Sequence, residues 1–346
     1  MKFQKTTVKK TIKSKFGKIE ISNDSVYLKD ITSIKISPYL KEKLVYIGQL
    51  DCYERGSEIA NYLMNVQTND TAIYRLTDKV GSMSQALIEK EDTRNPIELA
   101  AEDKLYVQCD GSMLLTREEG WKEVKLGRIF KSSSILPETL ERQWIRESEY
   151  VAHLGSHYEF ENKMSRLIDD VYVKRGDDII FIGDGAKWQW NWIKAEYPKA
   201  VRILDFYHAM EHVGKYLNTV IRSKNNIKTY MQKIGGILKR KGVKSMMNYI
   251  QKIPNNTKKK KEEFEKLKAY IENNKDKMDY PMYIKKGYLI GSGAIESAHR
   301  TVLQKRMKQS GQRWSKNGLK NMINIRVLKM SGYWNKIEDL IYQNVA

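Results

Sequence analysis

The sequence is poor in cysteine and proline and has no long apolar run. Cys52 and Cys109 are its only cysteines, which excludes a cysteine-based zinc finger and a disulfide framework and is typical of a reducing cytoplasm. With 6 prolines and 41% hydrophobic residues, the chain can form a packed core. No apolar stretch reaches the roughly 18 residues that span a membrane, and the basic first residues lack the apolar segment of a secretory signal. We expect a cytoplasmic protein with no membrane partner.

Acidic residues are scarce relative to basic ones. The chain carries 62 Lys and Arg against 42 Asp and Glu, a formal net charge of +20. This excess predicts a polyanionic partner, and nucleic acid is the one we expect. Residues 297–329 hold nine Lys or Arg and no Asp or Glu, so this segment is expected to contact phosphate groups. The lysine run at 258–261 differs, because the acidic residues directly after it indicate a solvated helix face.

Two short helical patterns stand in the N-terminal region. Residues 57–66 and 71–81 each repeat apolar side chains at helical spacing. Asn69 or Asp70 can cap the second helix, and Gly81 can end it. Two short helices joined by a tight turn are typical of a helix-turn-helix that reads DNA with its second helix. An ordinary helical hairpin has the same pattern.

The middle of the chain has strand patterns that alternate with helices. Its first three segments are expected to form antiparallel strands, and a continuous apolar run predicts a buried strand further on. In chain order, the segments are strands at 104–111, 112–117 and 121–133, a helix at 161–176, a strand at 178–185, a helix at 187–198 and a strand at 200–208. A helical block then extends to about residue 286. This order predicts an α/β protein with a mixed sheet.

Two aspartates end strands, and each is followed by glycine. Asp110 ends the first strand and Asp184 ends the buried one, so neighbouring strands would bring both to one edge of the sheet. Glu296 falls in the first turn of a helix that begins after Ser292. Two aspartates and one glutamate suffice to hold two Mg²⁺ ions for phosphodiester chemistry, because the ions keep water and substrate phosphate as other ligands. The plain alternative is that each Asp-Gly pair marks a turn.

Two long strings carry a resemblance to a known family. FIGDGAKWQWNWIKAEYPKAVRILDFYHAMEH at 181–212 and LIGSGAIESAHRTVLQKRMKQSGQRWSKNGLKNMINIR at 289–326 resemble bacterial insertion-sequence transposases of the DDE type. Their group shares an Asp-x-x-His motif and a helical insertion before the last acid with Mutator-like and hAT elements. The motif is matched by Asp205 and His208.

The resemblance implies a fold, a site and partners. The fold is an α/β RNase H-like core with an all-α insertion and an N-terminal helical DNA-binding region. Asp110, Asp184 and Glu296 are the implied catalytic residues and the ligands of two Mg²⁺ or Mn²⁺ ions. The implied partners are double-stranded DNA, as transposon ends and target, and a second copy of the chain on paired ends. The implied location is the bacterial cytoplasm, in association with the nucleoid.

Further residues receive supporting or binding roles. Asp205 is a rival for the second acid and forms a supporting pair with His208. His299 lies one turn after Glu296 on the same helix face, where it can approach the scissile phosphate or simply pack. Of the tryptophans at 188, 190 and 192, at least one is expected in the core. The DNA-binding candidates are Arg75, Arg300, Lys305, Arg306, Lys308, Arg313, Trp314, Lys316 and Lys320.

The leading hypothesis is a DNA transposase that performs metal-dependent cleavage and strand transfer. One alternative is a sequence-specific DNA-binding protein on a catalytically inactive or domesticated transposase scaffold. Another, ranked lower, is an RNase H-type nuclease that acts on RNA–DNA hybrids. The expected domains are a helical DNA-binding region at 1–100 with the helix-turn-helix candidate at 57–81, a first core part at 101–210, an all-α insertion at 211–286 and a second core part at 287–346.

Overall fold

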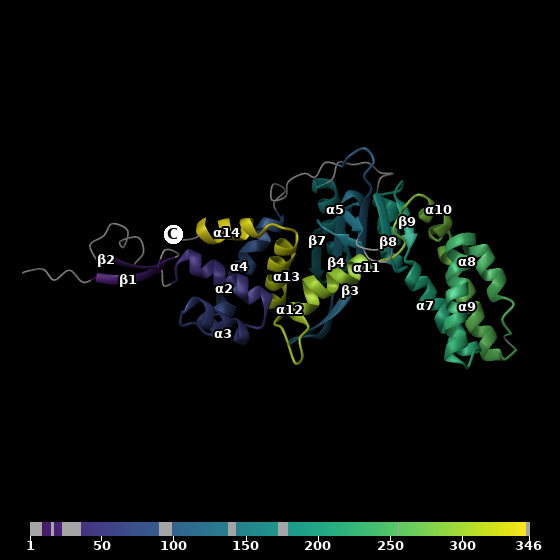
Figure 1. Cartoon of the computed structure of the whole chain (residues 1–346), viewed down its shortest axis with the longest axis horizontal. Coiled ribbons are helices and arrows are strands. Elements are labelled where there is room, and N and C mark those ends of the chain that lie inside the picture. Colours follow the sequence, from purple (N-terminus) through teal and green to yellow (C-terminus); the bar gives the residue numbers. More distant parts are fainter. Residues whose placement is uncertain are drawn as a thin grey trace, which may run out of the picture. The chain divides into compact units, whose positions relative to one another are not determined.

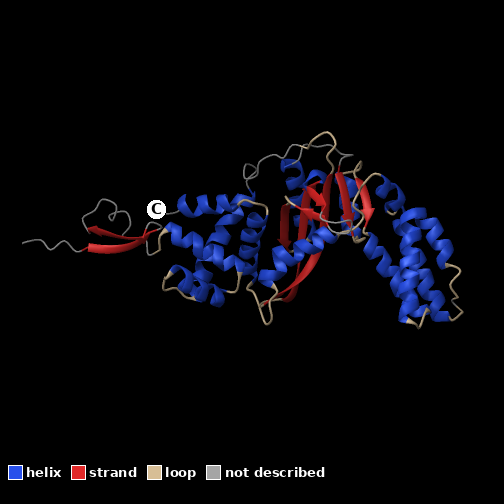
Figure 2. Ribbon diagram, in the orientation of Figure 1, coloured by secondary structure: helices blue, strands red, loops and turns tan. Residues whose placement is uncertain are grey.

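The chain divides into two compact units, Met1–Lys90 with Asn317–Ala346, and Glu91–Lys316. Figure 1 colours the elements along the chain, and Figure 2 colours them by type. The computed structural model describes residues 9–14, 17–22, 36–89, 99–137, 143–171, 179–254 and 256–343. The last residues of the predicted helix at 161–176 therefore lie outside the described residues. No helix in the described segments is long and apolar enough to cross a membrane.

The first unit combines helices from both ends of the chain. Its elements are the hairpin β1 (Lys9–Ser14) and β2 (Gly17–Ser22) and helices α2 (Pro38–Leu50), α3 (Tyr53–Met64), α4 (Asp70–Glu89), α13 (Lys316–Met330) and α14 (Trp334–Gln343). Val45 of α2 and Ile325 of α13 are fully buried in one apolar cluster. The buried Arg326 guanidinium donates a hydrogen bond to the Gln49 side chain at 2.7 Å. Segments about 280 residues apart thus share one core.

Helices α3 and α4 occupy the region of the predicted helix-turn-helix. Helix α3 is followed by Asn65 in the left-handed conformation, with φ of 49°. Asn69 caps α4, because its side-chain oxygen accepts the Ala72 N–H at 2.8 Å. The link between the helices therefore comprises residues 65–69.

The prediction that Gly81 ends the second helix is wrong. Helix α4 continues past it to residue 89. A Cβ at position 81 would lie 2.4 Å from the backbone oxygen of Asn321. Glycine is present because α4 and α13 approach closely here, and the sequence signal of a helix end was a packing signal instead.

The second unit is built on a five-stranded mixed sheet, ordered β7-β4-β3-β8-β9. The strands are β3 (Leu105–Thr116), β4 (Gly120–Lys131), β7 (Glu149–Leu154), β8 (Ile179–Gly183) and β9 (Val201–Leu204), with a small pair, β5 (Ile135–Pro137) and β6 (Gln143–Ile145), beside them in sequence. β4 pairs antiparallel with β3 and β7, whereas β8 pairs parallel with β3 and β9. The protein is therefore a mixed α/β protein.

The prediction of three separate strands at 104–111, 112–117 and 121–133 is wrong. The first two segments form the single strand β3, so the expected set of three antiparallel strands does not form from them. Asp110 and Gly111 were interpreted as a strand end, but they stay in register with Leu126 and Lys125 of β4. The partner strand continues past this point, and its ladder holds the Asp-Gly pair extended.

Helices cover both faces of this sheet. The helices are α5 (His157–Val171), α6 (Lys187–Glu196), α11 (Gly293–Ala298) and α12 (Lys305–Met307), with a π-helical turn at His299–Gln304 between the last two. A Cβ at Gly127 would meet Met164 of α5, whereas the adjacent Arg128 donates to the Ala294 carbonyl of α11. Successive strand residues point to opposite faces, so α5 and α11 lie on opposite sides of the sheet.

The helical block follows the last strand. It consists of α7 (Phe206–Val220), α8 (Lys224–Ile250), α9 (Lys258–Asn274) and α10 (Tyr280–Lys285), and Figure 1 shows α7 leading from the sheet to α8 and α9. Buried Tyr216, Leu238 and Leu267 join these helices to the main core. Helix α8 is interrupted at Gly242, where φ is 75°.

Candidate functional site

The sheet register brings three aspartates to one level. Gln108 of β3 pairs with Ile182 of β8, so Asp110 and Asp184 each lie two residues beyond a paired position. The Asp205 N–H donates to the carbonyl of residue 183 at 2.8 Å, which brings the end of β9 to the same level. The ends of β8 and β9 and the middle of β3 thus present acidic side chains at neighbouring positions.

Helix α11 is fixed over this edge by two side chains from the sheet. Gln108 accepts the Ile295 N–H at 3.0 Å through its side-chain oxygen. Arg128, which is buried, donates to the Ala294 carbonyl at 2.8 Å. The next residue along α11 is Glu296, whose side chain is exposed. These two sheet residues were not among the predicted site residues, because nothing local in the sequence marks a contact across more than 160 positions.

The carboxylate of Asp205 joins the starts of two helices by hydrogen bonds. One of its carboxylate oxygens accepts the Tyr207 N–H at 2.8 Å and so caps α7. The other accepts the hydroxyl of Ser292, the residue before α11. The side chain is buried, and both oxygens are in use. Asp184 differs, because it is only half-buried and one of its oxygens accepts the Ala186 N–H at 3.0 Å, a bond within its own turn.

The carboxyl group of Asp110 is influenced by burial and by three neighbouring acids. The pKa of Asp110 is raised to about 6, first by burial and then by the negative charges of Asp184, Glu123 and Glu296, while a hydrogen bond from the Gly111 N–H opposes the shift. The charges of the predicted acids Asp184 and Glu296 therefore act on Asp110, although these side chains do not approach one another as closely as the ligands of one ion do among the described residues. Glu123 was missed, since it lies in the middle of a strand pattern with no neighbouring signal.

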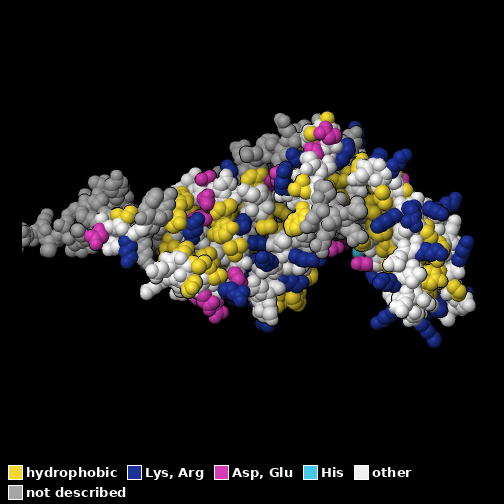
Figure 3. Space-filling model, in the orientation of Figure 1, with side chains coloured by type: hydrophobic (Ala, Val, Ile, Leu, Met, Phe, Trp, Pro, Cys, Tyr) yellow, Lys and Arg dark blue, Asp and Glu magenta, His cyan; other side chains and the backbone are white. Residues whose placement is uncertain are grey.

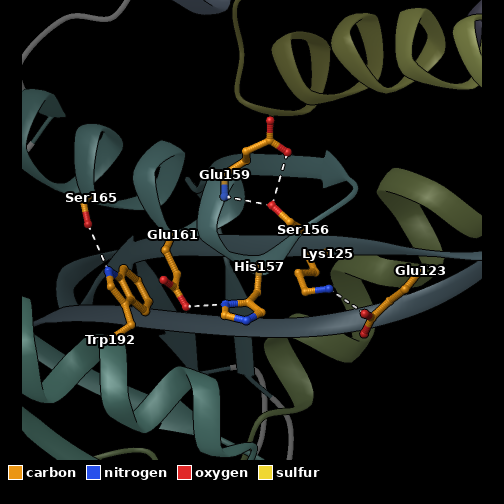
Figure 4. Close-up of polar contacts among 8 residues, drawn as sticks. All are labelled: Glu123, Lys125, Ser156, His157, Glu159, Glu161, Ser165 and Trp192. Carbon is orange, nitrogen blue, oxygen red and sulfur yellow. Dashed lines mark hydrogen bonds and ion pairs between the residues drawn. The ribbon is translucent and has the colours of Figure 1, made fainter.

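The glycine after Asp110 makes room for this fourth acid. A Cβ at Gly111 would lie 2.0 Å from a carboxylate oxygen of Glu123. Glu123 also pairs with Lys125 at 2.5 Å, a buried lysine on the same strand (Figure 4). The carboxylate of Glu123 therefore occupies the space beside Gly111.

The ring of His299 lies next to Asp110. Its Nε2 lies 3.6 Å from Asp110 Oδ2, and its ring is buried at 4% exposure. Burial lowers the pKa of His299 to about 4, and the charge of Lys308 acts in the same direction. The imidazole is therefore neutral near pH 7. It lies at the start of a π-helical turn, a distortion found frequently at functional sites.

The helical block reaches the same region through Tyr270 of α9. Its hydroxyl lies 3.8 Å from the position of a Cβ on Gly185 and has no hydrogen-bond partner among the described residues. Burial and the charges of Asp184 and Asp205 raise the pKa of this phenol. Its ring stacks on His212 at 3.7 Å between centroids.

The two histidines of α7 lie close together. The His208 ring is 5.2 Å from that of His212, and His208 Nδ1 is 3.6 Å from a Glu211 oxygen. Burial, and then the charges of Lys215 and His208, lower the pKa of His212 to about 4. The stacked tyrosine and the low pKa give His212 a packing role in the neutral form.

The donor set suits a hard cation. Asp110, Asp184 and Glu296 offer only carboxylate oxygens, which Mg²⁺ and Mn²⁺ prefer, whereas the strand register places Glu123 on the opposite face of the sheet from Asp110. A divalent cation would offset the carboxylate repulsion that, after burial, contributes to the raised pKa of Asp110. In the described parts of the chain, however, no three Asp, Glu, His or Cys side chains stand close enough together to hold an ion.

The predicted DNA-binding residues fall into two groups. The first group is buried or paired. Arg306 is 1% exposed and Trp314 is 6% exposed, and the Arg306 guanidinium lies 5.0 Å from the centroid of the Trp314 ring. Lys316 pairs with Glu119. The candidates with exposed side chains are Arg75, Arg300, Lys305, Lys308, Arg313 and Lys320. Arg75 and the segment from Asn317 onward belong to the first unit.

An exposed tryptophan lies beside the basic segment, although it was not predicted. Trp121 is 55% exposed at the start of β4, and Lys308 Nζ lies 5.8 Å from the centroid of its ring. Trp190 and Trp192 are buried, and Trp188 is half-buried against His157, while Trp192 donates to Ser165 at 3.0 Å (Figure 4). Sequence position among lysines did not distinguish an exposed ring from a buried one.

The fold and the site define a mixed α/β protein with an acidic edge in a strongly basic chain. Residues 5–340 match the model of a family described as Uncharacterised protein family (UPF0236), and the chain belongs to this family. Two UPF0236 proteins of Caldanaerobacter subterraneus subsp. tengcongensis are 27% and 26% identical to it over 309 residues. These matches cover 86% of this chain and 60% and 56% of the relatives, so the chain spans less than two thirds of their length.

The resemblance to bacterial insertion-sequence DDE transposases is corrected by these comparisons. Both the family model and the relatives carry the UPF0236 name, and none carries the name of a transposase. The two strings that suggested the resemblance contain strand ends and helix starts marked by Asp, Gly and Ser. Such signals report local backbone geometry, which unrelated families share.

Proposed function

We propose that this protein is a metal-dependent enzyme that cleaves DNA and transfers the cut strand, as a transposase does. One observation carries the proposal: burial, and then the charges of Asp184, Glu123 and Glu296, raise the pKa of Asp110 to about 6. Clustered carboxyl groups of this kind destabilise one another and are typical of a functional site. They lie in a chain with a net charge of +20, which favours a polyanionic substrate.

The strand order supports an RNase H-like core. Numbered along the chain, the sheet reads third, second, first, fourth and fifth strand, with the first two antiparallel and the fourth and fifth parallel to the first. In this interpretation, Asp110 lies on the central strand, Asp184 follows the fourth, and Glu296 lies on a helix that crosses the same edge. These are the residues that would hold two Mg²⁺ or Mn²⁺ ions.

Bound divalent ions would supply an activated hydroxyl nucleophile and charge stabilisation on the leaving oxygen. The side chains of the chain itself hold the site in position. Neutral His299 faces Asp110 at 3.6 Å and can accept a hydrogen bond from its protonated form. Gln108, Arg128 and Asp205 hold the start of α11 and thereby the position of Glu296.

The name of one relative provides support that is independent of the structure. It joins eleven locus designations from a single organism. A protein encoded at many loci is what a mobile element produces. We extend the proposal to a pair of chains acting on two DNA ends, in association with the nucleoid, since joining two ends requires both to be held at once.

A cleavage assay tests the proposal. Purified protein is incubated with supercoiled plasmid in Mg²⁺ or Mn²⁺ and in EDTA, and nicked and linear products are counted. We expect metal-dependent cleavage that Asp184→Asn and Glu296→Gln reduce at least 100-fold. Glu262→Gln, on an exposed face of α9, is the matched control and should cleave normally. Metal binding is followed separately by calorimetry. Cleavage that persists in Asp184→Asn contradicts the proposal.

A DNA-binding protein without catalysis is the second candidate. The observation that favours it is the absence, among the described residues, of three side chains close enough to hold an ion. It predicts tight duplex binding that is unchanged by Mg²⁺, Mn²⁺ or EDTA, together with no strand cleavage and no calorimetric metal signal.

A further inference from the structure

The helical block contains a long segment without acidic residues. From residue 212 to residue 261 there are 14 Lys or Arg and no Asp or Glu. The segment covers most of α7, all of α8 and the start of α9. Twelve of these basic residues are exposed: Lys215, Arg222, Lys224, Lys228, Lys233, Arg240, Lys241, Lys244, Lys252, Lys258, Lys259 and Lys261. Figure 3 shows Lys and Arg side chains spread over this part of the unit.

These twelve basic residues have no acidic partners in the described part of the chain. None of the twelve forms an ion pair with a carboxylate there, whereas three lysines further along the chain do. Lys266 pairs with Glu263 at 2.6 Å, and Lys268 with Glu265 at 4.0 Å. Lys275 pairs with Glu272. Acidic side chains in the described part of the chain therefore leave the positive charge of these twelve residues without ion pairs.

Four bases flank the break in α8 at Gly242, namely Lys239, Arg240, Lys241 and Lys244, and we call them the basic kink. The Lys239 Nζ lies 4.5 Å from the centroid of the Phe206 ring. A Cβ at Gly235 would lie 3.4 Å from the same ring. Phe206 directly follows Asp205, so Lys239 lies near the strand end that carries Asp205, and the whole basic kink belongs to the same unit.

We propose that the basic kink and the exposed Lys and Arg side chains of α8 bind the phosphate backbone of duplex DNA. This DNA would lie beside the sheet edge that carries Asp110 and Asp184. The inference rests on the proposed function, because it takes DNA as the substrate. From Lys224 to Arg240 the helix extends roughly 24 Å at about 1.5 Å per residue, the length of about seven base pairs at about 3.4 Å each.

The surface does not suit a membrane. The apolar face of α8 is already used, since Ile234, Leu238, Met246 and Ile250 are buried in the core. A helix that binds a membrane surface needs an apolar face free to enter the lipid. Lys and Arg side chains that form no ion pair in the described part of the chain suit the regularly spaced phosphates of a nucleic acid. Such contacts to the backbone form regardless of base sequence.

A charge-matched pair of variants tests the inference. The test variant is Arg240→Gln, Lys241→Gln and Lys244→Gln together, and the control is Lys266→Gln, Lys268→Gln and Lys275→Gln. Binding of a labelled 30-base-pair duplex of arbitrary sequence is measured by anisotropy in EDTA over a salt series. Both variants remove three positive charges from exposed positions, and thermal unfolding verifies that both fold.

We expect the test variant to lower the slope of log affinity against log salt by about 2.7, because each phosphate that the protein no longer neutralises lowers the slope by about 0.9. The control should keep the wild-type slope and an affinity within twofold. Equal reductions of affinity in the two variants, or no change in either, overturn the inference. So does a reduction that appears only with an RNA duplex of the same length.

The binding assay also separates this inference from the proposed function. If the test variant binds DNA normally while the wild type cleaves plasmid with metal, the inference fails and the proposed function stands. If the wild type binds no duplex at all, both fail.

Discussion

The carboxylate of Asp205 accepts the hydroxyl of Ser292 across 87 positions of sequence. One residue caps α7 and the other precedes α11, so this hydrogen bond joins the starts of two helices that border the acidic edge. Glu296 lies one turn further along α11. The contact makes Asp205 a structural residue in this fold, which favours Asp184 over it as the second acid.

Removal of this hydroxyl should destabilise the second unit. Ser292→Ala leaves a buried carboxylate oxygen without its donor, and a hydrogen bond to a charged group contributes about 1.5–3 kcal/mol. We expect a decrease of this size in the free energy of unfolding measured with urea. Ser297→Ala, at an exposed position of the same helix, should change it by less than about 0.5 kcal/mol. Equal effects would mean that Ser292 only contributes helix propensity.

Asp110 should make stability depend on pH. Its pKa rises from 3.8 in the unfolded chain to about 6 in the fold, with burial as the first cause and three carboxyl charges as the next. The folded state therefore binds the proton more tightly, and stability from this group is present below about pH 4 and is lost as pH rises through 6.

The variant Asp110→Asn removes this dependence. We expect it to be more stable than the wild type above pH 6 in EDTA, with a difference that shrinks toward pH 4. The effect is moderated by solvent, since 41% of the Asp110 side chain is exposed. Unfolding curves at pH 4, 5, 6 and 7 measure it, with Glu262→Gln as the control. A difference that does not change with pH contradicts the assignment.

Two tryptophans beside the basic segment should respond in opposite ways. Trp314 is buried and donates to the Met307 carbonyl at 3.1 Å, so Trp314→Ala should cost about 3–5 kcal/mol of stability. Trp121→Ala should cost less than about 0.5 kcal/mol, because the ring is 55% exposed. Under the proposed function, Trp121→Ala should still weaken DNA binding. Unchanged binding would exclude Trp121 from the DNA surface.

Two helical glycines provide a further matched pair. Gly81→Ala should cost about 1–3 kcal/mol, because the new Cβ would meet the backbone of Asn321 at 2.4 Å. Gly236→Ala should instead stabilise by up to about 1 kcal/mol, since its nearest neighbour is the flexible end of Arg240 at 2.9 Å and alanine favours helix. Thermal unfolding of both variants measures the difference. A destabilised Gly236→Ala would show that Arg240 cannot move.

The acidic site was predictable in part. Asp110, Asp184 and Glu296 were predicted from local signals, namely Asp-Gly pairs and a Glu in a first helical turn, although Asp110 lies within β3 and not at its end. Glu123, Gln108 and Arg128 were not found, because each acts through a partner on another element. The resemblance pointed to the wrong family for a related reason. Short sequence strings reflect local backbone geometry, which unrelated families share, more than common ancestry.

By itself, the sequence determined where chain segments become helices and strands and how they are charged. The apolar run at 179–182 fixed a buried strand, Asn69 fixed the start of α4, and the excess of lysine fixed a basic surface. These depend on spacing, caps and charge, which act over a few residues.

Only the tertiary structure decided which of these segments meet. It kept β3 continuous through Asp110, turned Gly81 into a packing contact, buried Trp314 rather than Trp121, and joined both chain ends in one unit. The physical reason is that burial and pairing depend on the partner element. That partner lies tens to hundreds of residues away, beyond the reach of any local pattern.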